Sequence, residues 1–367
     1  MTLAKGTPDI IRGSDQMFTT LYEGNGGGQK VGKFVPFTDN GTIAKSLIIN
    51  DGDNAFLSRT NDSGDRTRAT VSFWVKRAHL SGNINYIFTS YDGSSSNDGY
   101  IRFNTDNTIS TRIGTGSSHL YVTNRSFEDT SKWYHIVLAV NTNDSTANDR
   151  VKLYVDGDLL TSYSSRTNPG QGDTTQFNYS SATFRIGSTT GGAYDFDGYL
   201  AEFNYIDGTT YEPSTFGLTD TSTGRWIPKT LTGITYGTNG HRLEFANSAG
   251  QTIGDDTSGN TNDFSVTNSV AGDITTDSPT QNHATLQGTG GTISEGNLKL
   301  VTGNSEQGHH NATLKPKSGK YYAEFTCNAM GRSEVGVVSN LLVPYPTNTT
   351  RMPATPDGSI AGLMYYG

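Results

Sequence analysis

Apolar and polar residues alternate over three segments that follow one another closely in the chain. The segments are residues 133–140 (WYHIVLAV), 151–157 (VKLYVDG) and 184–187 (FRIG). Side chains of a β-strand point alternately to its two faces, so a period of two predicts strands. Three such segments in succession, with turn residues between them, predict neighbouring antiparallel strands of a β-sandwich.

The same alternation occurs earlier, at residues 71–76 (VSFWVK) and 100–103 (YIRF). Trp74 and Trp133 lie inside these strands, so we expect both to be buried. Asp-Gly pairs supply turns, because glycine accepts the positive φ that tight hairpins require. These pairs are residues 92–93, 98–99, 156–157, 197–198 and 207–208. No convincing amphipathic helix interrupts this region, and the pattern predicts an all-β protein.

Several blocks of sequence together resemble one known family of folds. They are residues 72–75 (SFWV), 133–135 (WYH), 153–157 (LYVDG), 186–187 (IG) and 196–203 (FDGYLAEF). In this order and spacing they are similar to the laminin-G-like, concanavalin-A-like jelly rolls, and the resemblance covers about residues 46–212. It implies an antiparallel jelly-roll β-sandwich of a type that binds surfaces more often than it catalyses.

The length of 367 residues allows two domains with connecting segments. Residues 213–282 predict a connector and resemble the segment that follows laminin-G-like domains in structural proteins of tailed phages, particularly marine ones. Residues 318–325 and 333–338 are similar to the opening strands of a SPRY domain, so residues 283–367 predict a second, smaller and partial β-rich domain. Residues 1–45 contain GNGGG and predict a flexible arm or attachment segment, and the resemblance to phage proteins implies that it attaches the chain to a virion.

Charge and hydropathy exclude several classes of partner. The formal net charge is −8 and only 17% of residues are charged, which argues against binding to a nucleic-acid backbone. No run of about 18 apolar residues occurs, so we expect no membrane insertion. The N-terminal sequence lacks the apolar stretch of a secretory signal, and Cys327 is the single cysteine. We therefore expect a chain made in the host cytoplasm and stabilised by packing or assembly.

Acidic residues in loops are candidates for metal binding rather than catalysis. The Glu-x-Asp-x-Glu pattern of retaining sugar hydrolases on jelly rolls is absent, and Gly198 follows the one similar pair, Asp195 and Asp197. We therefore assign no catalytic residue and expect a protein that is not an enzyme. Calcium prefers several oxygen ligands, and laminin-G-like folds often bind it at the sandwich rim. The candidate ligands are Asp92, Asp98, Asp195 and Asp197; the alternative is that these residues only form turns.

Tyrosines beside polar loop residues are candidates for sugar binding. An aromatic ring can stack on the apolar face of a pyranose while neighbouring polar groups bind its hydroxyls. The candidates are Tyr91, Tyr100, Tyr121 and Tyr194. The alternative is that these tyrosines cap the edge of the sandwich.

The resemblance to structural proteins of tailed phages implies a structural protein of a phage virion, of the tail-fibre or spike type, whereas composition alone supports only a soluble β-rich binding module. Its predicted partners are other virion proteins and host-surface glycans, and many copies would raise the avidity of weak sugar binding. A closed homo-oligomer, with a trimer favoured, fits that role. Two alternatives stay open: a capsid decoration protein that binds capsid subunits and, less favoured, a polysaccharide depolymerase. Apart from calcium, the sequence predicts no cofactor.

Overall fold

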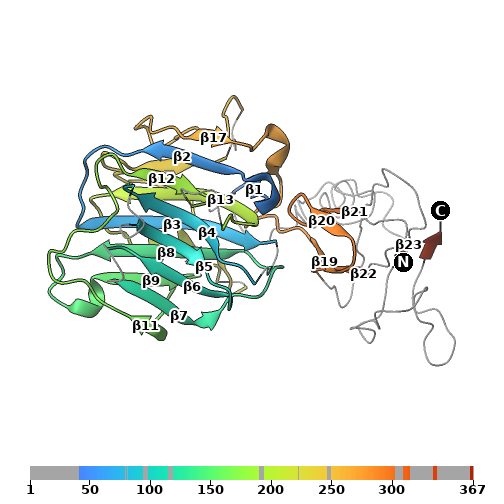
Figure 1. Cartoon of the computed structure of the whole chain (residues 1–367), viewed down its shortest axis with the longest axis horizontal. Coiled ribbons are helices and arrows are strands. Elements are labelled where there is room, and N and C mark those ends of the chain that lie inside the picture. Colours follow the sequence, from blue (N-terminus) through green and yellow to red (C-terminus); the bar gives the residue numbers. More distant parts are fainter. Residues whose placement is uncertain are drawn as a thin grey trace, which may run out of the picture.

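The computed structural model is an all-β protein built on two antiparallel sheets that pack face to face (Figure 1). It describes residues 41–314, apart from 79, 81, 94–97, 115–118, 190–193, 222, 246–248 and 302–308, together with two later strands, β23 (Glu334–Gly336) and β24 (Met364–Tyr366). The four helices in these ranges are 3-10 turns of three residues each, and no helix there is long and apolar enough to cross a membrane. The fold class expected from the alternation is confirmed.

Sheet A has the strand order β10-β9-β8-β3-β13-β1-β18, with β16 also paired to β13. Its strands are β1 (Ser46–Ile49), β3 (Arg68–Arg77), β8 (Tyr134–Asn141), β9 (Val151–Val155), β10 (Asp158–Leu159), β13 (Gly198–Asp207), β16 (His241–Leu243) and β18 (Ile274–Thr275). A two-residue turn joins β9 to β10, where Asp156 and Gly157 have φ values of 54° and 87°. Positive φ at both positions fits a type I′ hairpin, as the Asp-Gly pair predicts.

Sheet B has the strand order β11-β7-β6-β5-β4-β12-β2-β17. Its strands are β2 (Phe56–Thr60), β4 (Asn85–Tyr91), β5 (Asp98–Phe103), β6 (Thr108–Arg112), β7 (Leu120–Ser126), β11 (Tyr163–Arg166), β12 (Thr183–Ile186) and β17 (Ser265–Thr267). Strands β11 and β17 lie at the two edges. Every pairing in both sheets is antiparallel.

The main core lies between the two sheets. Phe73 of β3 stacks on Phe203 of β13, with ring centroids 5.3 Å apart and planes only 10° apart. From sheet B, the Phe88 ring lies 5.7 Å from that of Phe203, and Phe184 packs beside it. All four side chains are fully buried. Burial of each side chain of this kind stabilises a fold by about 1.5–3 kcal/mol, so the aromatic contacts hold the two sheets together.

The outer face of sheet A is buried too. Because Phe73 and Val75 of β3 face the inter-sheet core, Trp74 between them must point to the other side. It is nevertheless only 3% exposed, because residues after 213 pack over this face. Phe216 and Tyr236 contact a second apolar cluster there, which includes Val137. Trp133 is also buried on this outer face, at 6% exposed.

Trp226 docks this covering layer onto the sheet. It lies in β15 (Trp226–Pro228), which pairs with β14 (Gly217–Thr219). Its indole N–H donates a hydrogen bond to Nδ1 of His135 at 3.0 Å. Because a neutral imidazole has only one N–H, that proton must be on Nε2, which donates to Ser72 Oγ at 2.9 Å. The imidazole also stacks on Trp74, with centroids 4.6 Å apart. Burial lowers the pKa of His135 to about 3, which keeps the ring neutral at physiological pH.

Residues 213–282, which the sequence predicts as a connector, therefore contribute strands to both sheets. Strand β16 pairs with β13, β17 pairs with β2, and β18 pairs with β1. Leu243, Phe245 and Phe264 from this segment are buried in the main core. These strands are only two or three residues long, too short to show a period in the sequence.

A buried ion pair anchors the far end of the covering layer. Lys76 Nζ lies 2.8 Å from Asp277 Oδ2, and both side chains have no solvent exposure. Trp133 Nε1 donates to the other carboxylate oxygen at 3.0 Å, and Lys76 also donates to Asn282 Oδ1 and to the carbonyl of His283. Burial lowers the pKa of Lys76, and the Asp277 carboxylate opposes that shift. The hydrogen bonds satisfy both charges inside the protein.

Two short hairpin-like sheets follow the sandwich and lie beside it (Figure 1). Strand β19 (Leu286–Thr289) pairs with β22 (His309–Ala312), and β20 (Thr292–Ser294) pairs with β21 (Lys299–Val301). The Tyr199 hydroxyl of β13 donates to the carbonyl of Gly296, and the Gly296 N–H donates to Asn50. The SPRY-like segment at 318–325 and residues 1–40 of the predicted arm lie outside the described residues.

The buried ion pair leads to a prediction about stability. Asp277→Asn should lower the free energy of unfolding by about 3–5 kcal/mol, because it leaves the Lys76 ammonium buried without a counter-charge. The midpoint of urea unfolding measures this loss. Lys152→Gln is the control, because Lys152 pairs with exposed Asp149 and Glu212 and should cost at most about 1 kcal/mol. Equal midpoints for wild type and Asp277→Asn would contradict the anchoring role.

Candidate functional site

The outer face of sheet B carries a group of tyrosine and arginine side chains. Tyr100 and Arg102 are two residues apart on β5 and so share one face of the sheet. Arg112 of β6 lies directly opposite Tyr100, and Tyr86 of β4 lies opposite Arg102. With Tyr194, which follows β12, these five residues form what we call the tyrosine–arginine face.

The rings and guanidinium groups of this face are in close contact. The Tyr86 and Tyr100 rings meet edge to face with centroids 5.4 Å apart. The guanidinium of Arg102 lies 4.6 Å from the Tyr100 centroid and 5.2 Å from that of Tyr86, and that of Arg112 lies 5.0 Å from Tyr100. Cation–π contacts of this kind each contribute about 0.5–2 kcal/mol, so the group is held in a defined arrangement.

Tyr194 is the exposed member of the face. Its side chain is 56% exposed, whereas Tyr86 is 8% and Tyr100 4% exposed. The Tyr194 ring lies 6.3 Å from that of Tyr86, and its carbonyl accepts a hydrogen bond from the Tyr86 N–H at 3.0 Å. A backbone φ of 62° at Tyr194 turns the chain at this point. The face therefore presents one accessible ring backed by others that are fixed.

The two arginines differ in how their charge is balanced. Arg112 forms an ion pair with the carboxylate of Asp98, and its Nε also donates to the carbonyl of Asp98. Arg102 donates to neutral groups: to Asn104 and Ser110 from Nε at 3.2 and 3.0 Å, and to the Tyr86 hydroxyl from Nη1 at 2.6 Å. Among the described residues, Arg102 has no carboxylate partner, and the face carries a local positive charge.

The structure brings some of the predicted sugar-binding tyrosines together and separates others. Tyr100 and Tyr194 both belong to the tyrosine–arginine face. Tyr91 is half-buried at the other end of β4, where it pairs with Asp98. Tyr121 faces the inter-sheet core at 1% exposed, and its hydroxyl donates to Asn168. In this conformation the ring faces of Tyr100 and Tyr121 are not open to a ligand.

Sequence reasoning missed three members of the face, namely Tyr86, Arg102 and Arg112. The alternation YIRF at 100–103 does place Arg102 beside Tyr100, so this neighbour could have been found. The positions of Tyr86 and Arg112 depend on strand register. A shift in register between Tyr86 and Phe88 sets which side chains of β4 face outward, and no pattern in the sequence marks it.

The four predicted calcium ligands occupy different environments. Asp98 is ion-paired with Arg112, and Asp92 is half-buried after β4. Asp195 is 7% exposed, and its backbone carbonyl accepts a hydrogen bond from Asn85. Within the described part of the chain, no three acidic, histidine or cysteine side chains are grouped so that they could hold a metal ion. Calcium binding stays a prediction.

Asp197 is the most perturbed of these carboxyl groups. Burial and, to a smaller extent, the negative charge of Asp51 raise its pKa to about 7, while Arg77 opposes the shift. The group therefore changes its charge close to neutral pH.

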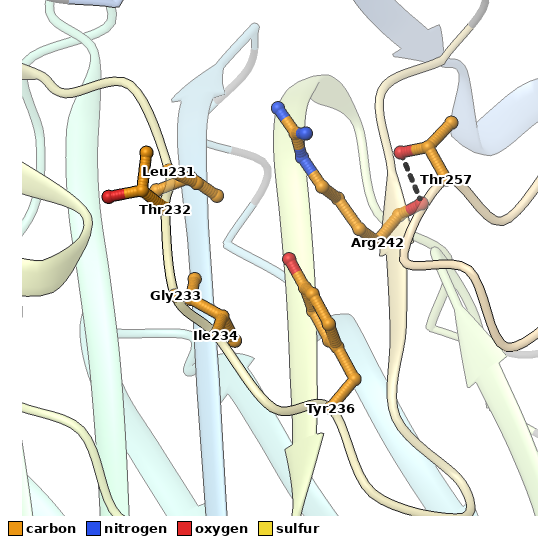
Figure 2. Close-up of a pocket in the computed structure, with 7 residues that line it drawn as sticks. All are labelled: Leu231, Thr232, Gly233, Ile234, Tyr236, Arg242 and Thr257. Atoms are coloured by element: carbon orange, nitrogen blue, oxygen red, sulfur yellow. Dashed lines mark hydrogen bonds between the residues drawn. The ribbon is translucent and has the colours of Figure 1, made fainter.

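A pocket of about 140 Å³ lies on the outer side of sheet A, under the chain that covers it. Figure 2 shows its lining, with the side chains of Tyr236 and Arg242 across from the loop. The lining residues are Leu231, Thr232, Gly233, Ile234, Tyr236, Arg242 and Thr257. Arg242 lies 2.5 Å from a Glu202 oxygen and 3.0 Å from a Glu244 oxygen, so its charge is already compensated.

Comparison with known proteins agrees with the fold. Residues 50–211, less than half of the chain, match the family model described as the concanavalin A-like lectin/glucanases superfamily, of laminin-G type. No curated protein matches the chain.

Similar solved structures include a heptameric SAP-like pentraxin from Limulus polyphemus, which is 18% identical to this chain. The alignment covers 45% of this chain and 77% of the pentraxin chain, with a TM-score of 0.33. A second is domain 4 of the arabinanase AbnA from Geobacillus stearothermophilus, in complex with arabinotriose, which is 20% identical. The alignment covers 48% of this chain and 76% of the AbnA domain, with a TM-score of 0.33. A putative carbohydrate-binding protein from Bacteroides ovatus is 14% identical, with 52% and 59% covered and a TM-score of 0.30. At these identities and TM-scores the likeness carries no conclusion about the ligand of this chain.

The fold and the family match together identify residues 50–211 as a laminin-G-like, concanavalin A-like domain. The resemblance seen in the sequence is confirmed for this part of the chain. The SPRY-like segment and the phage setting stay predictions.

The raised pKa of Asp197 makes a testable prediction. In the folded protein the Asp197 carboxyl keeps its proton up to about pH 7, whereas in the unfolded chain it loses the proton near pH 3.8. Because the folded state binds the extra proton between these values, the free energy of unfolding falls as pH rises from 3.8 to 7. Asp197→Asn removes this dependence, and its stability relative to wild type should increase by about 2–3 kcal/mol between pH 5 and pH 8. Asp62→Asn, at an exposed aspartate, is the control. Urea unfolding at several pH values measures the difference, and parallel profiles would contradict it.

Proposed function

We propose that this chain is a structural protein of a tailed-phage virion, of the tail-fibre or spike type, and that its sandwich binds host-surface glycans. The lectin-like fold of residues 50–211 supports a binding role, and the phage setting rests on the resemblance of residues 213–282 to connectors in such proteins. The protein binds the glycan and does not cleave it. Its place is on the virion, after synthesis in the host cytoplasm.

The observation that carries this proposal is the difference between the two outer faces. The outer face of sheet A is covered by the chain itself, through Phe216, Trp226 and Tyr236. The outer face of sheet B carries the exposed ring of Tyr194 next to the fixed ring of Tyr86, which in turn contacts Arg102. Sugar sites in proteins combine an accessible ring with a few fixed polar groups, and sheet B offers both.

Affinity in this proposal comes from several weak contacts repeated over many copies. The apolar face of a sugar ring stacks on Tyr194, while the amide of Asn104 and the guanidinium of Arg102 contact its polar groups. One such site binds weakly, so a closed homo-oligomer, with a trimer favoured, raises the avidity. Residues 1–45 attach the chain to other virion proteins, with residues 41–45 the only described part of that arm.

The glycan-binding proposal predicts the effect of one substitution. Tyr194→Ala should weaken binding to host-envelope polysaccharide at least tenfold, because the sugar loses its stacking surface. Binding to polysaccharide immobilised on a biosensor measures the loss. Tyr179→Ala is the matched control, because Tyr179 is 38% exposed and precedes β12 at the end remote from Tyr194. If both variants bind as the wild type does, Tyr194 is not part of the site.

The location on the virion has its own test. Antibody raised against the chain should label purified phage particles at the tail, in a small number of copies. Electron microscopy of gold-labelled particles gives the position and the number. Labelling spread over the capsid surface in hundreds of copies would support the decoration role instead, and unlabelled particles would contradict both.

A further inference from the structure

We propose that the tyrosine–arginine face selects glycans that carry carboxylate groups, and that Arg102 binds the carboxylate. This inference rests on the proposed glycan-binding function and names the class of sugar. It follows from the charge, the hydrogen bonds and the position of one guanidinium group.

Arg102 is a cation without a balancing charge in the described structure. Arg112 beside it is paired with Asp98, and Arg242 at the pocket on sheet A is paired with Glu202 and Glu244. The bonds of Arg102 all go to neutral acceptors. In a chain with net charge −8, such an arginine on a sheet face has an unmet preference for an anion.

The guanidinium of Arg102 is also held in place before any ligand binds. Its Nε donates hydrogen bonds to Asn104 and Ser110, its Nη1 donates to the Tyr86 hydroxyl, and its central carbon lies 4.6 Å from the Tyr100 ring centroid. Among the described residues, no hydrogen bond uses Nη2. A guanidinium that is already held in place and has a free N–H donor loses little conformational entropy when it binds a planar carboxylate.

The contacts of Tyr86 with both Tyr194 and Arg102 favour a charged sugar over a separate anion. Tyr86 is in contact with both partners, because its ring lies 6.3 Å from the Tyr194 ring and 5.2 Å from the Arg102 guanidinium. An acidic sugar could therefore stack its ring on Tyr194 and direct its carboxylate toward Arg102. The negative charge of the whole chain opposes long polyanions such as nucleic acids, so one carboxylate next to a stacked ring is the better fit.

The test compares acidic glycans with their uncharged esters. The probe is an array of uronic-acid and nonulosonic-acid oligosaccharides, each printed beside its methyl ester, together with phosphorylated sugars. The wild type should bind the acids at least tenfold more strongly than the esters, because a hydrogen bond to a charged group is lost on esterification. Added salt should weaken binding to the acids more than to the esters.

Three variants assign the preference to Arg102. Arg102→Gln should bind acids and esters equally, while Arg102→Lys should keep part of the preference, because it retains the charge without the fork. Arg125→Gln is the control: it removes the same charge from an arginine that stacks on Phe127, at 4.9 Å, and should keep the full preference. Thermal unfolding of each variant checks that the fold is retained.

The outcomes separate this inference from the proposed function. Binding to glycans without a preference for acids, a preference that persists in Arg102→Gln, or a stronger preference for phosphorylated sugars would overturn the inference and leave glycan binding in place. If no glycan on the array binds, the proposed function fails and this inference fails with it.

Discussion

Burial of sheet A on both of its faces is the constraint on which the rest of this structure depends. Strands β3 and β8 are buried at almost every position, although one row of their side chains faces sheet B and the other would face water without a covering layer. Exposure of Trp74, Trp133 and Val137 together would leave a large apolar surface. Residues 213–297 remove that surface from water, and Trp226 and the Lys76–Asp277 pair fix them in position.

This constraint leaves the two sheets in different roles. The outer face of sheet A is committed to internal packing, and even its pocket has an arginine whose charge is matched by Glu202 and Glu244. The outer face of sheet B is made of polar and aromatic side chains that satisfy one another without a further apolar layer. There the exposed Tyr194 ring contacts Tyr86, and Tyr86 in turn contacts the guanidinium of Arg102, which has no carboxylate partner among the described residues. The site follows from which face the chain covers.

Much of the fold could be predicted from local pattern. The alternation at 133–140 and 151–157 predicted strands that correspond to β8 and β9. The Asp156–Gly157 pair predicted the turn that follows β9. The covering layer could not be predicted in this way, because three-residue strands such as β15 and β16 show no period. It is defined by long-range contacts, such as that between Trp226 and His135, which are 91 residues apart.

The candidate site was only partly predictable for the same reason. Tyr194 and Tyr100 were found from their polar neighbours, whereas Tyr121 has similar neighbours and points into the core. Face and register decide between these outcomes, and one residue of slip reverses the face. The pairing of β13 with β16 likewise places Glu202 and Arg242 together from positions 40 residues apart, which no local motif predicts.

Hydrogen–deuterium exchange with and without a bound acidic oligosaccharide tests the central claim most directly. If the ligand binds the outer face of sheet B, protection should appear in β4, β5, β6 and the segment around Tyr194. Residues 213–245 of the covering layer should be unchanged. Protection confined to residues 231–242, around the pocket on sheet A, would contradict the account.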